Sequence, residues 1–189
     1  METFIFIAQN NEHMFKKLNL FSKTEMKLLG FISARDGELY ERQIAKEAKV
    51  STGSVNNIMK DFARMGLVTR TKKGHMIFYA RNDRSALLRQ FKISMTLNSL
   101  REPMEKIAPL SRRIILFGSC AEGRNGEKSD IDLFVLSREK EAIRRILDDY
   151  PGIQAIILDS SEYTDLQQKD KPLYDRIQRG IELRGDEDG

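Results

Sequence analysis

Two acidic residues, Asp130 and Asp132, stand at the head of an apolar stretch, 131–136, that we expect to form a buried strand. Because side chains alternate along a strand, both carboxylates should lie on the same face of a sheet. Two acids this close repel each other unless a cation lies between them. Carboxylate oxygens favour hard ions, so the pair predicts Mg²⁺, or Mn²⁺, as cofactor, with both aspartates as metal ligands and catalytic residues.

A glycine-serine turn precedes this pair. Gly118 and Ser119 follow a second apolar stretch, 113–117, and are small enough for a phosphate group to approach the backbone amides closely. A metal ion at the aspartates would bridge nucleotide phosphates and stabilise charge on the transferred phosphorus. Cys120, the only cysteine, is open to two interpretations, a small loop residue or a reactive thiol. The expected nucleotide-binding residues are Gly118, Ser119, Arg124, Lys128 and Ser129.

The stretch 117–123, followed by 129–133, resembles the minimal nucleotidyltransferases of the DNA polymerase beta superfamily. Ten residues separate Ser119 from Asp130, which is the spacing in that family. The resemblance extends from about 112 to 184. It implies a small mixed sheet backed by helices, and metal-dependent transfer of a nucleotidyl group from a nucleoside triphosphate to a hydroxyl. Related proteins often act as antitoxins, so the resemblance also implies a separate toxin protein as a partner.

The sequence departs from that family in two places. Family members often carry arginines in the loop after Gly-Ser, where this chain has Cys120 and Glu122. The family's third carboxylate is expected in the strand 153–158, where this chain has Gln154. Asp159 replaces it only if that strand bends or bulges, and Glu162 is more remote. The sequence therefore leaves open a working transferase or a metal- and nucleotide-binding site without turnover.

The N-terminal part begins with helical periodicity. Ser22 and Glu25 fit a capping box at the start of one helix. A second helix is expected at 41–48, and Ser51 caps a third. The third helix carries an apolar stripe made of Val55, Ile58, Met59, Phe62 and Met65.

Strand periodicity follows these helices. Strands are expected at 67–71 and 76–80, joined by a basic hairpin tip at 72–75. This order resembles the winged helix-turn-helix family over residues 21–81, and implies binding of double-stranded DNA. The alternative is a domain that serves only dimerisation or protein docking. Polar and basic side chains suited to base edges and phosphates are the expected DNA contacts, namely Thr52, Ser54, Asn56, Asn57, Lys60, Arg64, Lys72 and Lys73.

The fold class predicted from these patterns is α+β, with a winged helix-turn-helix, a helical connector and a polymerase-beta-like domain with a small mixed sheet. The expected boundaries are 15–82, 83–110 and 111–185. The apolar residues of the connector suggest a homodimer, or simply an internal helix. The 189 residues carry a net charge of +4 and contain no apolar run long enough for a bilayer, so we expect a cytoplasmic protein without membrane contact.

Overall fold

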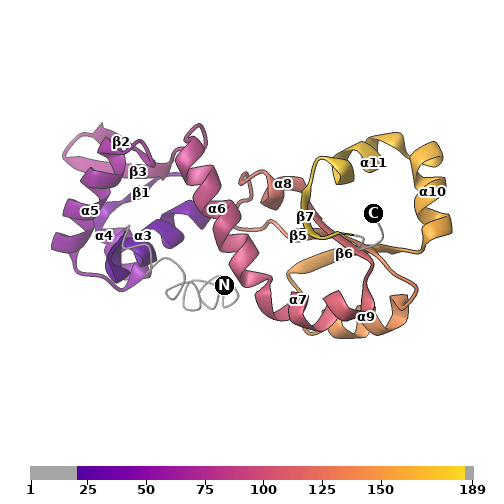
Figure 1. Ribbon diagram of the computed structural model, residues 1–189. Coiled ribbons are helices and arrows are strands. Elements are labelled where there is room, and N and C mark those ends of the chain that lie inside the picture. The colour runs from indigo at the N-terminus through magenta and orange to yellow at the C-terminus, as the bar shows by residue number, and fades with distance from the viewer. Residues whose placement is uncertain (1–20, 186–189) are drawn as a thin grey trace. The chain divides into compact units, whose positions relative to one another are not determined.

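The structure is a computed structural model, and it describes residues 21–185 (Figure 1). The N-terminal apolar stretch 4–8 and the acidic residues 186–188 lie outside the described part. The chain forms two compact units, divided between Met95 and Thr96. In the described part, no helix has the length and apolar character that crossing a membrane requires.

The first unit packs three helices on a small antiparallel sheet. Its strands are ordered β1-β3-β2. The helices are α3 (Lys23–Ala34), α4 (Glu41–Ala48) and α5 (Thr52–Arg64), and the strands are β1 (Leu39–Tyr40), β2 (Val68–Lys73) and β3 (Met76–Arg81). The fully buried core residues include Leu29, Ile44, Met59, Phe62 and Tyr79. This order of helices and strands agrees with the one expected from the sequence, apart from the short strand β1.

The helix starts in this unit follow the expected capping chemistry. The backbone N–H of Glu25 donates to Ser22 Oγ at 3.3 Å, and the Ser22 N–H donates to Glu25 Oε2 at 2.7 Å, so the capping box is confirmed. Ser51 Oγ accepts from the N–H of Ser54 at 3.2 Å and caps α5. Lys49, at φ 51°, makes the tight left-handed connection between α4 and α5.

Two details of the first unit correct the sequence prediction. Met65 is 48% exposed and does not join the buried stripe of α5. Ten residues after Val55, its side chain has turned about 80° from the centre of that stripe at 3.6 residues per turn. The hairpin tip is also shorter than expected, because Lys73 pairs with Met76 and only two residues form the turn. Lys72 and Lys73 therefore lie in β2.

The second unit is built on a four-stranded mixed sheet in the order β6-β5-β4-β7. β4 pairs with β5 and β7 in antiparallel fashion, whereas β5 and β6 are parallel. The strands are β4 (Arg113–Phe117), β5 (Ile131–Leu136), β6 (Ile153–Leu158) and β7 (Ile181–Arg184). The helices are α7 (Arg101–Ile107), η1 (Ala108–Leu110), α8 (Gly118–Ala121), α9 (Lys140–Leu147), α10 (Ser160–Lys169) and α11 (Lys171–Gln178). The α+β class with a small mixed sheet is thus confirmed.

Helices cover both faces of this sheet (Figure 1). On one face Leu133 and Val135 of β5 pack with Ile143 and Leu147 of α9. On the other face Phe134 packs with residues of α10 and α11. Since neighbouring strand residues face opposite ways, Asp132 shares the α10–α11 face with Phe134.

The predicted connector, 83–110, is divided between the two units. Leu88 and Phe91 of α6 (Ala86–Ser99) belong to the first core. Leu100 and Ile107 belong to the second. Four apolar residues of this stretch are therefore buried in two separate cores, whereas Leu87 and Leu97 of α6 are exposed.

Candidate nucleotide and metal site

Gly118 brings the end of β4 against the start of β5. Phe117, the last residue of β4, pairs with Asp132 of β5, and the chain then turns at Gly118 with φ +72°. This left-handed conformation is one that glycine adopts at little cost. A Cβ atom at Gly118 would overlap the Asp132 carboxylate, and would stand 3.2 Å from its Cγ. The position therefore requires glycine both for its conformation and for the approach of the carboxylate.

Asp130 and Asp132 lie close enough to act on each other electrostatically. Burial raises the pKa of Asp132 above its ordinary value, and the negative charge of Asp130 raises it further. The positive charge of Arg176 opposes both effects. Two anions held together in this way favour a divalent cation between them, as the sequence predicts.

Cys120 is buried and contacts the backbone of Asp130. Its side chain is 1% exposed, and Sγ donates to the backbone carbonyl of Asp130 at 3.4 Å. A buried thiol bonded to the main chain is a structural residue. The interpretation of Cys120 as a small residue in the loop is thus favoured over a reactive thiol.

Gln154 occupies the place where a third carboxylate was expected. β6 runs parallel to β5 with Asp132 opposite Gln154, and the register continues without a shift to the ends of both strands. Gln154 Nε2 donates to Asp130 Oδ2 at 2.6 Å. In residues 21–185, no three acidic, cysteine or histidine side chains gather in a way that could hold a metal ion. The residues present fit one divalent ion on two carboxylates, with a neutral amide beside them.

Asp159 and Glu162, the two alternatives for the third carboxylate, make other contacts in the structure. Asp159 caps α10 by accepting from the backbone N–H groups of Ser161 and Glu162 at 2.9 and 3.0 Å. The Glu162 N–H, followed by the Lys140 ammonium, lowers the pKa of Asp159. Glu162 also contacts Lys140, at 2.7 Å. Because β6 does not bend, Asp159 stands five residues beyond Gln154, about 16 Å along the strand. Neither acid is the missing third ligand.

Some of the loop residues predicted to bind nucleotide already make contacts within the protein, and others do not. Arg124 forms an ion pair with Glu122, which neutralises its charge. Ser129 Oγ accepts from the Gly126 N–H at 2.8 Å, so this hydroxyl stabilises the loop. Ser119 is half-buried in the short α8, and Lys128 is exposed. The structure thus brings Gly118 together with the two aspartates, but it does not gather the basic loop residues around them.

Arg176 is a site residue that the sequence did not reveal. It lies on α11, and its Cζ stands 5.7 Å from the centre of the Phe117 ring. Its charge acts on Asp132, which is 44 residues away in the chain. The effect of Arg176 on Asp132 follows from the packing of α11 on the face of the sheet that carries Asp132.

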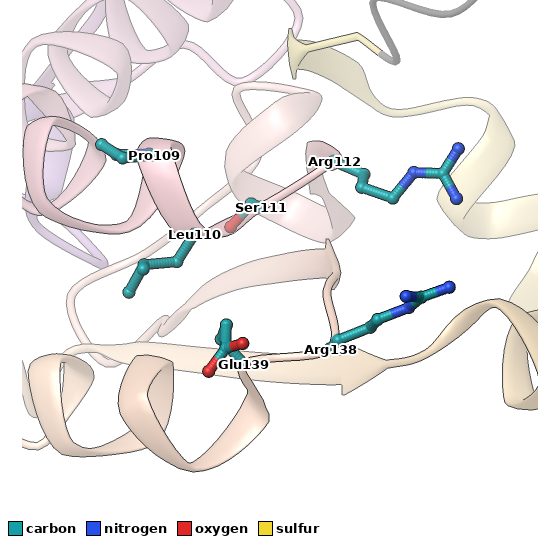
Figure 2. A pocket seen from close by; sticks show the side chains of 6 residues that line it. All are labelled: Pro109, Leu110, Ser111, Arg112, Arg138 and Glu139. Carbon is teal, nitrogen blue, oxygen red and sulfur yellow. The ribbon is translucent and has the colours of Figure 1, made fainter.

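A hollow of about 440 Å³ lies at the opposite end of β5 (Figure 2). Figure 2 shows the side chains of Arg112 and Arg138 extended in the same direction, with Glu139 apart from them. Asp130 and Asp132 stand at the beginning of the six-residue strand β5, whereas this hollow follows its end. The lining residues are Pro109, Leu110, Ser111, Arg112, Arg138 and Glu139, and none of them belongs to the predicted site.

The predicted DNA contacts lie on α5 and β2 of the first unit. Asn56 is engaged within the fold, because its Nδ2 donates to Glu41 Oε1 at 2.9 Å. Lys73 forms an ion pair with Glu38. The remaining predicted contacts include four exposed side chains, Thr52, Asn57, Arg64 and Lys72, and two half-buried ones, Ser54 and Lys60. Arg64 also contacts Asp61 of its own helix at 2.7 Å.

Residues 104–187 match the family model described as "Polymerase beta, Nucleotidyltransferase". This part contains the whole four-stranded sheet and every residue of the site at Gly118, Asp130 and Asp132. The match supports a nucleotidyltransferase-type function for the second unit. It ends short of the first unit, which it does not describe.

No curated protein matches the chain. A solved structure of TrmBL2, described as an archaeal chromatin protein with a novel mode of DNA binding, is 13% identical to it. The likeness covers 90% of this chain and 74% of that one, with a TM-score of 0.35. Similarity at this level carries no argument about fold or function.

The close approach at Gly118 predicts different outcomes for two glycine substitutions. Gly118 and Gly74 both have positive φ, but only Gly118 has an atom within 4 Å of the added Cβ. Gly74→Ala should cost about 1–2 kcal/mol of stability from the left-handed conformation alone. Gly118→Ala should cost more in urea unfolding and should abolish Mn²⁺ binding, whereas Gly74→Ala should bind Mn²⁺ normally. Unchanged Mn²⁺ affinity in Gly118→Ala would contradict the described geometry.

Proposed function

We propose that the second unit binds a divalent metal ion together with a nucleoside triphosphate and transfers a nucleotidyl group to a hydroxyl acceptor. The observation that carries this proposal is the pair Asp130 and Asp132 at the start of β5, with Asp132 against Gly118 and the charge of Asp130 acting on it. The family match over 104–187 supports the same class of chemistry.

Each residue of the site has a separate task in this proposal. Asp130 and Asp132 hold Mg²⁺ or Mn²⁺, and the backbone at Gly118 and Ser119 accommodates the triphosphate. The bound ion supplies stabilisation of negative charge on the phosphates. The hydroxyl oxygen of the acceptor attacks the α-phosphorus, and pyrophosphate leaves. The neutral amide of Gln154 cannot take the proton of that hydroxyl, so the proton passes to solvent water and turnover should be slow.

The second candidate function is a regulator whose nucleotide site binds without turnover. Two contacts favour it. Gln154 fills the third ligand position and bonds to Asp130 at 2.6 Å, and Arg124 is neutralised by Glu122. In this version the site senses a nucleotide or supports assembly of the protein.

Within the first unit, we propose that residues 15–82 form a winged helix-turn-helix domain that binds double-stranded DNA. α5 follows α4 after a tight left-handed turn, as a recognition helix does, and the β2–β3 hairpin forms the wing. Asn57 is placed to contact a base edge, and Lys60 and Arg64 to contact phosphates or guanine. Lys72 on the wing adds a phosphate contact.

Three further statements belong to this proposal. The protein acts as a homodimer in the cytoplasm, and 83–110 connects the DNA-binding and transferase domains. A toxin protein is the proposed acceptor of the nucleotidyl group, which would make the chain an antitoxin-type regulator. The family resemblance supports the toxin partner, and the exposed side chains of Leu87 and Leu97 on α6 support the homodimer.

Labelling with α-³²P nucleoside triphosphates and Mg²⁺ tests the transferase. The wild type should label an acceptor slowly, and Asp130→Ala/Asp132→Ala should label none. Gln154→Asp supplies a third carboxylate and should raise the rate at least tenfold. Gln154→Asn is the matched neutral control and should not raise the rate of labelling. If wild type and Gln154→Asp bind nucleotide but label nothing, the transferase is wrong and the regulator is supported.

The salt dependence of DNA binding tests the first unit. Affinity for duplex DNA should fall steeply with salt, and Lys60→Gln or Lys72→Gln should each reduce the slope of log K against log salt by about 1. Lys27→Gln, an exposed lysine of α3, is the control and should leave the slope unchanged. Binding that does not respond to salt, or equal slopes in all variants, would argue for a protein-docking domain.

A further inference from the structure

α11 places one cationic side chain on the face of the sheet that carries the aspartates. Ile177 is fully buried and packs in the same cluster as Phe117 and Phe134. Asp132 alternates with Leu133 along β5 and so lies on that same face. Arg176 precedes Ile177 and is exposed, so α11 is anchored beside the site while its arginine stays accessible.

Arg176 lies over the ring of the residue that precedes the glycine bend. Its Cζ lies 5.7 Å from the centre of the Phe117 ring, and Phe117 directly precedes Gly118. A guanidinium resting over an aromatic ring keeps its N–H edges available for a planar anion. In the described part of the chain, Arg176 makes no hydrogen bond and no ion pair, although its charge opposes the rise in the pKa of Asp132.

The nearby loop has two basic residues, Arg124 and the exposed Lys128, and neither charge acts on Asp132. Arg124 is held by Glu122, and the positions next to Ser119 carry no arginine. Of the described cations, Arg176 is the one whose charge acts on Asp132. A bound polyphosphate brings several negative charges, which one divalent ion does not neutralise. The site therefore needs a further cation, and the geometry offers it from α11.

We propose that Arg176 binds the triphosphate of the nucleotide held at Asp130 and Asp132, which rests on the proposed nucleotide site. The guanidinium supplies the positive charge that Cys120 and Glu122 of the loop do not. Its forked N–H groups match two oxygens of a phosphate, which a lysine at the same place would match less well.

This assignment predicts opposite effects on two ligands. Without nucleotide, the positive charge of Arg176 beside Asp132 repels a metal ion. Its removal should therefore leave Mn²⁺ binding equal or tighter. With nucleotide, the same removal takes away a charge-assisted contact to phosphate and should weaken binding about tenfold. A residue that only supported the fold of the site would change both affinities in the same direction.

The experiment measures both ligands on the full chain by titration calorimetry. The probes are Mn²⁺ alone, and the α,β-methylene analogues of ATP, CTP, GTP and UTP with Mg²⁺. Arg176→Gln should bind the preferred analogue about tenfold more weakly, with Arg176→Lys between it and the wild type. Arg145→Gln is the matched control, because Arg145 is exposed on α9 at the other face of the sheet. Its affinities should equal those of the wild type.

The outcomes separate this inference from the proposed function. Nucleotide affinity of Arg176→Gln within threefold of the wild type overturns the role of Arg176, while the nucleotide site stands. Parallel loss of Mn²⁺ and nucleotide binding also overturns it, because Arg176 would then only hold the site together. If the wild type itself binds no analogue, the nucleotide site fails, and the role of Arg176 fails with it.

Discussion

Electrostatic repulsion between Asp130 and Asp132 is the constraint on which the site depends. The two carboxylates share one face of the sheet, and the bend at Gly118 presses against one of them. Burial and the neighbouring charge raise the pKa of Asp132, so the ionised pair is unfavourable without a counter-charge. Two neighbouring side chains reduce the electrostatic cost of ionising both carboxylates. Gln154 donates a hydrogen bond to Asp130, and Arg176 places a positive charge near Asp132. A divalent ion would complete the compensation.

The replacement of a third acid by Gln154 changes the balance of charge at the site. A third carboxylate would add repulsion and strengthen the hold on metal ions, whereas an amide leaves a weaker site with no base. The same trend is seen in the loop, where Glu122 neutralises Arg124. These two changes favour binding over rapid turnover, and they explain why the transferase and the regulator remain the two candidates for one architecture.

Local patterns were sufficient to predict most of the fold. The capping box at Ser22, the cap at Ser51 and the alternation around Asp132 depend on residues a few positions apart, and the structure confirms them. The position of Gln154 was predicted from family spacing, and the parallel register with β5 agrees. Met65 was misplaced because it follows the last residue of α5 and, at 3.6 residues per turn, its side chain lies about 80° from that of Val55.

Contacts between distant residues were beyond reach of the sequence. Asn56 bonds to Glu41, and the charge of Arg176 acts on Asp132 although more than forty residues separate them in the chain. Each contact depends on how a helix packs, which no local pattern determines. The ion pair between Arg124 and Glu122 in the loop could not be predicted either, because the sequence shows both residues but not that they contact each other.

Anomalous diffraction from crystals grown with Mn²⁺ and a non-hydrolysable nucleoside triphosphate tests the central claim most directly. The account predicts an anomalous peak between the carboxylates of Asp130 and Asp132, with metal–oxygen distances of about 2.1 Å, and phosphate density beside Gly118. Carboxylates that point apart, or an Asp132 locked in an ion pair with Arg176 and no metal between the acids, would contradict it.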